Sequence, residues 1–263
     1  MLASYVPIDW QKFLSFLEDR RPGLPNKIHG ASPADLEALR RRSPVSLPEN
    51  YLGFLRHFGG EDGGFRVFPR HFYLVRELLH EVIQAPLGWD PSRCLLIGIM
   101  ESRDCEDPHD LFLDLSQADA TDAPLVGLDP DPEEPNAECF PIAPSLADRL
   151  IIQIAWRLVD RPKKAKARLV AFGNPSSKGT AVPHLYRELV SVAEKLGFVA
   201  CVSATSNTWM GRQGRETFAL IHASQECDLA AMDLCGDDPI PIAQVREVVE
   251  DLGLAEPMSV LPD

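Results

Sequence analysis

Long apolar runs are missing from this chain of 263 residues, and so are the short motifs of several enzyme classes. No run of about 18 apolar residues occurs, which argues against a membrane-spanning helix. The start of the chain has neither a basic end nor a long apolar stretch, so we expect no secretory signal and a cytoplasmic protein. Neither a G-x-S-x-G elbow nor an H-E-x-x-H zinc motif is present, which argues against the hydrolases that depend on them.

Paired cysteines are absent as well. The six cysteines are scattered, with no Cys-x-x-Cys pair, and we expect them to be reduced. Cys94 and Cys201 lie in apolar runs, which predicts small buried side chains. Cys105 and His109 have the spacing of one edge of a metal site, but no second ligand pair lies nearby. We therefore expect neither a metal nor another cofactor.

Basic residues are scarce in one window, which carries nearly all of the net charge. The formal net charge of the chain is -13, and residues 101–138 contain thirteen acidic residues with Arg103 as the single base. A field of this sign steers a basic partner and repels nucleic acid and anionic membranes. We therefore expect a protein partner, with solvated loops that bind nothing as the alternative.

Two groups of acids within this window are the predicted contact residues. They are Asp104, Glu106, Asp107 and Asp110 in the first group, and Asp129, Asp131, Glu133 and Glu134 in the second. The second group alternates acids with other residues, but the glycine and the ligand spacing of an EF-hand loop are missing. A calcium site is therefore the weaker interpretation.

The segment of residues 32–64 predicts two short helices followed by glycines. Ser32 and Pro33 are typical of a helix start, and Leu47-Pro48 begins the second helix in a similar way. Gly59-Gly60 is expected to end that helix in the left-handed conformation. An apolar stripe predicts one buried face on the second helix, made of Tyr51, Leu52, Phe54, Leu55 and Phe58.

This order of residues resembles the SUKH superfamily, which includes fungal cell-wall-assembly regulators and bacterial immunity proteins. The residues that carry the resemblance are Glu37, Leu47-Pro48, Tyr51, Phe54-Leu55 and Gly59-Gly60. Phe58 departs from the pattern, because a polar residue usually precedes the glycine. The resemblance covers residues 1–160 and implies helices packed on an antiparallel sheet. It also implies a protein that binds and neutralises a secreted bacterial toxin, often a nuclease, or one that acts in cell-wall regulation.

The periodicity predicts an α+β fold in two domains. In the first domain, residues 1–160, the expected helices cover 9–20, 33–42, 48–58, 71–84 and 145–160. The expected strands there cover 65–68, 95–100, 110–115, 124–128 and 139–142. A basic joint that begins at Arg161 leads into a second small α+β domain, residues 161–263, of a family that the pattern does not identify.

In the second domain, the expected strands cover 168–172, 198–202, 218–222 and 229–234. A helix is predicted for residues 180–196, stopped by Gly197, and a last helix runs from Pro241 to Gly253. The loop of residues 173–180 lies between a strand and a helix, which suits an anion. The order of its lysine and glycine is reversed relative to a phosphate loop, so a polar turn capped by Thr180 is the preferred interpretation.

Five further side chains are candidates for a functional role. Trp209 and Arg212 lie in the polar segment 203–215, where they are predicted as secondary partner contacts; a tryptophan folded back on its own domain is the alternative. His57 lies on a predicted helix as a surface or half-buried side chain, and so does His80. His109 lies among acids that favour its charged form, which suits an interface better than general-base catalysis.

The residues and the resemblance together favour a cytoplasmic immunity protein without catalytic residues. Its acidic surface would bind a basic toxin, and a nuclease in particular, because an enzyme that attracts a polyanion tends to be basic around its site. A scaffold or regulatory protein is the second hypothesis. An enzyme that binds a nucleotide in the loop from Gly173 to Thr180 is the third.

Overall fold

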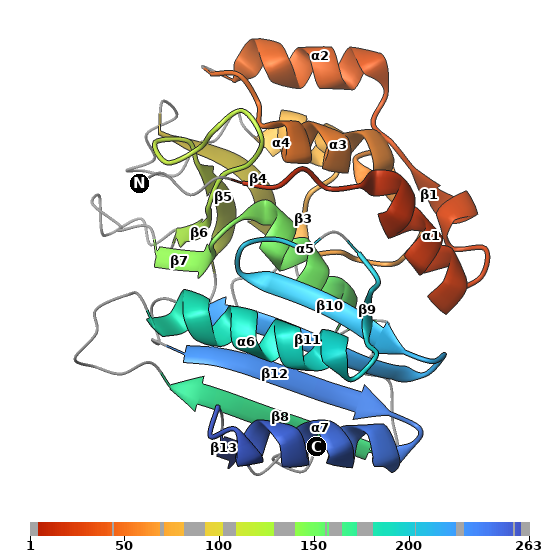
Figure 1. Ribbon diagram of the computed structural model, residues 1–263. Coiled ribbons are helices and arrows are strands. Elements are labelled where there is room, and N and C mark those ends of the chain that lie inside the picture. Colours follow the sequence, from red (N-terminus) through yellow and green to blue (C-terminus); the bar gives the residue numbers. More distant parts are fainter. Residues whose placement is uncertain are drawn as a thin grey trace. The chain divides into compact units, whose positions relative to one another are not determined.

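The computed structural model describes residues 5–43, 45–68, 71–81, 93–101, 109–128, 140–155, 157, 165–172, 181–202, 204–224, 229–254 and 256–258. These residues form a mixed α+β structure with antiparallel sheets, as predicted (Figure 1). The described helices are α1 (Trp10–Arg20), α2 (Pro33–Arg42), α3 (Glu49–Phe58), α4 (Val75–Glu81), α5 (Leu146–Ile154), α6 (Ala181–Lys195), α7 (Pro239–Asp251) and the 3-10 turn η1 (Pro25–Lys27).

The described strands belong to three sheets. The smallest pairs β1 (Ile28–His29) with β2 (Glu61–Asp62). A five-stranded sheet has the order β3 (His71–Phe72), β4 (Cys94–Met100), β5 (Asp110–Asp114), β6 (Leu125–Leu128) and β7 (Phe140–Ala143). A six-stranded sheet has the order β13 (Glu256–Met258), β8 (Ala165–Phe172), β12 (Leu229–Gly236), β11 (Thr217–Ser224), β10 (Thr208–Gln213) and β9 (Val199–Ala200).

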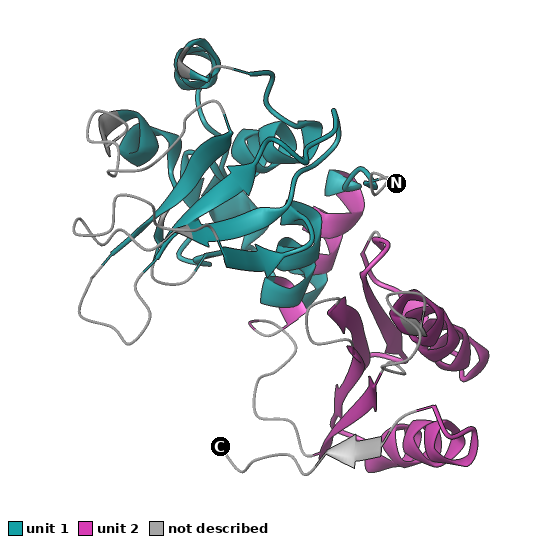
Figure 2. Ribbon diagram, turned by 90° about the vertical axis from the view of Figure 1, so that its left-hand side faces the viewer, with its two compact units in different colours: residues 1–10, 17–153 teal, residues 11–16, 154–263 magenta. Residues whose placement is uncertain are grey.

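The chain divides into two compact units, which Figure 2 distinguishes by colour. The first contains residues 1–10 and 17–153, and the second contains residues 11–16 and 154–263. The second unit therefore takes in the middle turn of α1, where the Phe16 ring meets the edge of the Phe218 ring at a centroid distance of 6.3 Å. The joint predicted at Arg161 lies outside the described residues.

The five-stranded sheet is an antiparallel meander buried on both faces. Leu78 of α4 packs on one face, against Cys94, Leu96, Phe112 and Val126. Leu95, Ile97, Leu111, Leu113 and Leu125 alternate with these residues along the strands and are also buried. This arrangement confirms the predicted strands, because near-continuous apolar runs are typical of a sheet covered on both sides.

The helices of the 32–64 segment form as predicted. Ser32 caps α2 by accepting a hydrogen bond from Asp35 N, and Pro33 occupies the first turn. The five residues of the apolar stripe on α3 are all buried. Without a side-chain cap, α3 begins with its amides at Glu49 and Asn50 donating to the carbonyls of residues 120 and 121.

The predicted role of Gly59-Gly60 is wrong. Gly59 has right-handed backbone angles (φ -73°), so no left-handed residue ends α3 at that point. The physical reason for glycine is a close approach of two chain segments. A Cβ on Gly60 would lie 2.4 Å from the Gly30 carbonyl oxygen, and a Cβ on Gly30 would lie 1.8 Å from the Arg56 carbonyl oxygen.

The second unit has two helices on one face of its six-stranded sheet. Both α6 and α7 contact the sheet, and their core includes Leu189, Val245, Ile221 and Met232. Gly197 and Gly253 follow the two helices with positive φ, as predicted. The last helix begins at Pro239 after the cap Asp238, and not at Pro241.

Three further predictions need correction. Residues 65–68 are not a strand; they form an irregular turn whose Phe65, Val67 and Phe68 are buried. The helix predicted for 71–84 begins only at Val75, because β3 occupies the first two positions. Six residues of the polar segment 203–215 form the strand β10, which pairs with β11 in an antiparallel ladder.

Candidate functional site: the acidic end of the first sheet

The topology of the five-stranded sheet brings two acidic segments to one of its ends. β4 ends at Met100 and β5 begins at Asp110, while β6 ends at Leu128 and β7 begins at Phe140. Asp110 and Leu128 are direct partners in the ladder. The described residues that flank 102–108 and 129–139 therefore include direct neighbours in the sheet, Asp110 and Leu128. We call this end of the sheet, with the two segments, the acidic end.

The two segments concentrate charge of one sign. Residues 102–108 contain three acids and one base, and residues 129–139 contain five acids and no base. Seven predicted contact residues belong to them and lie outside the described residues: Asp104, Glu106, Asp107, Asp129, Asp131, Glu133 and Glu134.

The prediction that Asp110 belongs to an exposed acidic surface is wrong. Its side chain is 3% exposed, and its Oδ1 accepts a hydrogen bond from Met100 N at 2.8 Å. The carboxylate closes the start of the β4–β5 hairpin, where a free amide would otherwise be buried. Asp110 is therefore part of the framework from which the acidic segment 102–108 leaves.

Two histidines and a phenylalanine lie at the strand ends beside the acidic segments. The His71 Nε2 is 2.9 Å from the His109 carbonyl oxygen, and the two rings are 5.6 Å apart. The His109 ring also meets the edge of the Phe140 ring at 5.2 Å. His71 begins β3, His109 directly precedes β5 and Phe140 begins β7, so three rings pack together at this end of the sheet. His109 is half-buried there, which agrees with an interface position better than with an open catalytic site.

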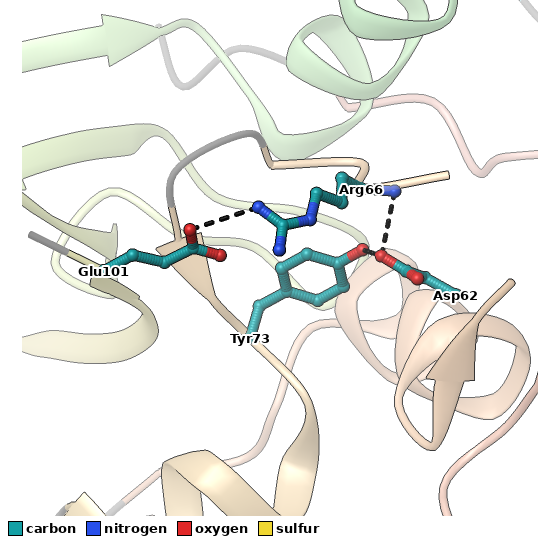
Figure 3. A network of polar contacts seen from close by, with 4 residues as sticks. All are labelled: Asp62, Arg66, Tyr73 and Glu101. Carbon is teal, nitrogen blue, oxygen red and sulfur yellow. Dashed lines mark hydrogen bonds and ion pairs between the residues drawn. The ribbon is translucent and has the colours of Figure 1, made fainter. Parts of the chain in front are cut away.

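A polar network leads from the acidic end to the turn after β2 (Figure 3). Arg66 Nη1 donates to Glu101 Oε2 at 3.1 Å, immediately before the segment 102–108. The Asp62 carboxylate accepts hydrogen bonds from the Tyr73 hydroxyl and from the Arg66 amide. The Tyr73 oxygen in turn accepts from Val67 N at 3.0 Å. The Asp62 carboxylate therefore holds both the turn and the Tyr73 side chain in place beside the Arg66–Glu101 ion pair.

The backbone of this turn is held in an uncommon conformation. Arg66 has φ +49°, which is rare for a residue with a Cβ. Its neighbours Phe65 and Val67 are buried, whereas the Arg66 side chain is 59% exposed. The buried neighbours and Asp62 together keep the left-handed backbone in place and point the guanidinium outward.

Glu77 adds a third carboxyl to the surroundings of Arg66. Its Oε2 accepts a hydrogen bond from Leu74 N at 3.2 Å, which closes the start of α4. Burial raises the pKa of Glu77, the hydrogen bond from Leu74 lowers it, and the charges of Asp62 and Glu101 raise it further. The local balance of charge is therefore negative in spite of Arg66.

An open depression of about 540 Å³ lies beside the Asp62 turn. Its lining residues are Asn26, Lys27, His29, Glu61, Asp62, Gly63, Gly64 and Leu74. Both signs of charge are present in the lining, and the His29 and Glu61 side chains form an exposed pair at 3.9 Å. The mixed lining does not select one class of small ligand.

Trp209 and Arg212, the predicted secondary partner contacts, are not supported by the structure. Trp209 is only 2% exposed and belongs to the core under α6 and α7, so the alternative of a tryptophan packed on its own unit is correct. Its ring lies over Gly211, where a Cβ would come within 2.1 Å. Arg212 is half-buried on the same strand, and an odd spacing of three residues directs it to the opposite face of the sheet.

Among the described residues, the other candidates for catalysis or metal binding find little support. His57 is half-buried beside the Trp10 ring, and burial together with Arg56 lowers its pKa. Cys94 and Cys201 are buried, as predicted. Within the described ranges, no group of three or more His, Cys, Asp or Glu side chains could hold a metal ion. Cys105 and the loop 173–180 lie outside those ranges, as does the side chain of His80.

Sequence reasoning missed the network of Asp62, Arg66, Tyr73 and Glu101. The order Asp-Gly-Gly at 62–64 is a signal for an Asx turn that was available. No sequence signal indicated that Tyr73 and Glu101 take part, because their positions depend on the pairing of β3 with β4.

Comparison of the chain with family models, with curated proteins and with solved structures returned no match. In the part of the chain that the structure describes, every helix is too short or too polar to cross a membrane. The functional assignment therefore depends on the site itself.

Proposed function

We propose that this chain is a non-catalytic binding protein whose acidic end docks onto a basic protein. The observation that carries the proposal is the pairing of Asp110 with Leu128, because these two residues neighbour the acidic segments 102–108 and 129–139 in the sequence. Their eight acids and one base produce a local field that accelerates encounter with a basic surface. Binding of this kind needs a complementary patch of roughly 800 Å² on each partner and no catalytic residue.

The most specific form of the proposal is an immunity protein that neutralises a bacterial toxin. Helices, an antiparallel meander and a closing helix follow one another along the first unit, which is the order expected from the SUKH resemblance. The sequence pattern that carries the resemblance lies on α2 and α3, and the apolar stripe of α3 is buried. These observations support the resemblance and, through it, a toxin as the partner.

Charge complementarity favours a nuclease among toxins. A nuclease must attract a polyanionic substrate, so basic residues surround its active site. The sequence of residues 101–138 contains Arg103 as its single Lys or Arg, and among the described residues at this end Arg66 pairs with Glu101. An acidic inhibitor would occupy the substrate-binding site of such a nuclease and would associate with it rapidly.

Recovery of the partner from the native host tests the proposal. The tagged wild-type chain should retain a basic secreted effector, identified by mass spectrometry. A variant with Asp104, Glu106 and Asp107 changed to lysine should lose it. Changing Glu18, Asp19 and Glu37 to lysine alters the net charge equally on exposed helical positions of the same unit, and this control should retain it. Equal retention by both variants would contradict the proposal.

A scaffold function is the second candidate, and one observation favours it. The second unit has its own core beneath α6 and α7 and offers a surface that the resemblance does not cover. A cell-wall or cytoskeletal complex among the recovered proteins, with no basic effector, would favour the scaffold.

If the chain is instead an enzyme that binds a nucleotide, addition of ATP or GTP should raise its melting temperature.

A further inference from the structure

Three residues of the turn after β2 have a left-handed backbone, and one of them is not a glycine. Gly63, Gly64 and Arg66 have φ of +63°, +73° and +49°. A Cβ on Gly64 would meet no other atom within 4 Å, so the backbone angle alone favours glycine there. Arg66 has the same kind of backbone and carries a long side chain. The backbone conformation therefore does not explain why residue 66 is an arginine.

The ion pair with Glu101 does not explain the arginine either. The Arg66 and Glu101 side chains are 59% and 27% exposed, and a pair this accessible contributes little to stability. A left-handed backbone costs a residue with a Cβ a similar amount, so the two effects offset each other. Phe65 and Val67 are buried and Asp62 accepts from the Arg66 amide, so the turn is held without the arginine side chain.

One edge of the Arg66 guanidinium is available to a partner. Its Nη1 donates to Glu101 Oε2 at 3.1 Å (Figure 3), and neither Nε nor Nη2 has a hydrogen-bond partner among the described residues. In the second unit the same edge of another arginine binds a carboxylate, because Arg168 Nε and Nη2 donate to Asp233 Oδ1 and Oδ2. The Nε–Nη2 edge of Arg66 can therefore take a carboxylate with two parallel hydrogen bonds.

The charges around Arg66 decide where such a carboxylate can lie. The surroundings contain Asp62, Glu77 and Glu101. The acidic segment 102–108 begins directly after Glu101. These acids would repel an isolated carboxylate, whereas a uniformly basic surface would place its cations against Arg66. A carboxylate set within a basic surface is complementary to both.

We propose that Arg66 is a specificity-determining residue of the acidic end, where it binds a carboxylate that the partner carries within its basic surface. This role rests on the proposed binding function and adds a requirement to it. By charge alone, a basic partner would bind more tightly once Arg66 is neutralised. With a carboxylate opposite Arg66, the same change weakens binding, so the sign of the effect separates the two possibilities.

Two lysine-rich peptides that differ at one central position, aspartate in one and asparagine in the other, serve as probes. Calorimetry at about 50 mM salt, where charges are screened less than at physiological salt, gives their affinities. The aspartate-to-asparagine affinity ratio should be about threefold higher for the wild-type chain than for Arg66→Gln. Arg41→Gln removes another exposed cation, paired with Glu37 at 3.1 Å, and should leave the wild-type ratio unchanged.

The outcomes distinguish this role from the proposed binding function. Binding of both peptides with the same ratio in the wild-type chain and in Arg66→Gln would overturn the role of Arg66 alone. Binding of neither peptide to the wild-type chain would contradict the proposed function, and the role of Arg66 with it.

The stability of Arg66→Gly tests the same inference without any partner. Glycine relieves the left-handed backbone while it removes the exposed ion pair, so the melting temperature should stay within about 3 °C of the wild type. Arg56→Gly also removes an exposed pair, with Glu49, but from the helix α3, and should lower the melting temperature more. If Arg66→Gly falls as far as Arg56→Gly, the arginine is needed for the fold and the inference is overturned.

Discussion

The two ends of the five-stranded sheet use acidic residues in different ways. In the β5–β6 turn, Asp114 accepts from Ser116 and Gln117, Asp119 accepts from two amides of its own turn, and Asp122 accepts from four donors. At the acidic end, Asp110 is buried and Glu101 pairs with Arg66, while the two acidic segments continue beyond them. The number of acidic residues in a sequence segment therefore does not measure how acidic the surface is. It also matters how many of those carboxylates take part in hydrogen bonds and ion pairs within the protein.

The largest expected difference between the ends concerns stability. Asp122→Ala removes an acceptor that four buried donors share, although Leu146 N and Asn50 Nδ2 each keep a second one, and it should lower the free energy of unfolding by about 3–5 kcal/mol. Asp131→Ala, in an acidic segment, should change it by less than about 0.5 kcal/mol. Urea unfolding of both variants measures the difference. Similar losses would mean that the acidic segments are structural as well.

Helix caps provide a comparison of intermediate size. Ser145 and Ser32 cap α5 and α2 with the same pattern, in which each serine accepts from the amide three residues later and donates to that aspartate. Ser145 is buried and Ser32 is exposed. We expect Ser145→Ala to cost about 1–2 kcal/mol and Ser32→Ala about 0.5–1 kcal/mol, measured by urea unfolding. Equal costs would show that burial at the β5–β6 end adds nothing to a cap.

The smallest expected effect concerns the left-handed residue at the acidic end. Both Arg66→Ala and Arg66→Gly remove the exposed ion pair with Glu101, which is worth at most about 1 kcal/mol. Only glycine adopts positive φ without strain, so Arg66→Gly should be more stable than Arg66→Ala by about 1 kcal/mol. Thermal unfolding of the two variants would reveal the difference. If alanine is as stable as glycine, the turn is not strained.

Local sequence signals predicted the helices and strands well. They could not predict which residues come together across the sheet. Ser32 and Pro33 marked the start of α2, and the glycines at 197 and 253 marked two helix ends. Trp209 was misjudged because its segment is polar in sequence, whereas the first four residues of β10, 208–211, are all buried. The burial of Asp110 and Asp122 could not be predicted, because the donors at Met100, Asn50, Leu146 and Ala147 lie ten or more residues away in the sequence.

The same limit applies to the candidate site. Sequence alone located the charge, and the antiparallel order of β4 to β7 revealed that Asp110 and Leu128, which flank the segments 102–108 and 129–139, are direct neighbours in the sheet. A window count also included Asp114 and Asp122, which the turn uses for its own hydrogen bonds. The physical reason is that hydrogen-bond demand depends on tertiary contacts, which composition does not contain.

The salt dependence of association tests the central claim most directly. The association rate of the wild-type chain with the recovered basic partner should fall steeply between about 50 mM and about 500 mM salt, because the charges are screened. Changing Asp104, Glu106 and Asp107 to lysine should slow association about tenfold or more at the lowest salt and abolish most of the salt dependence. Wild-type rates in that variant at every salt concentration would contradict the account.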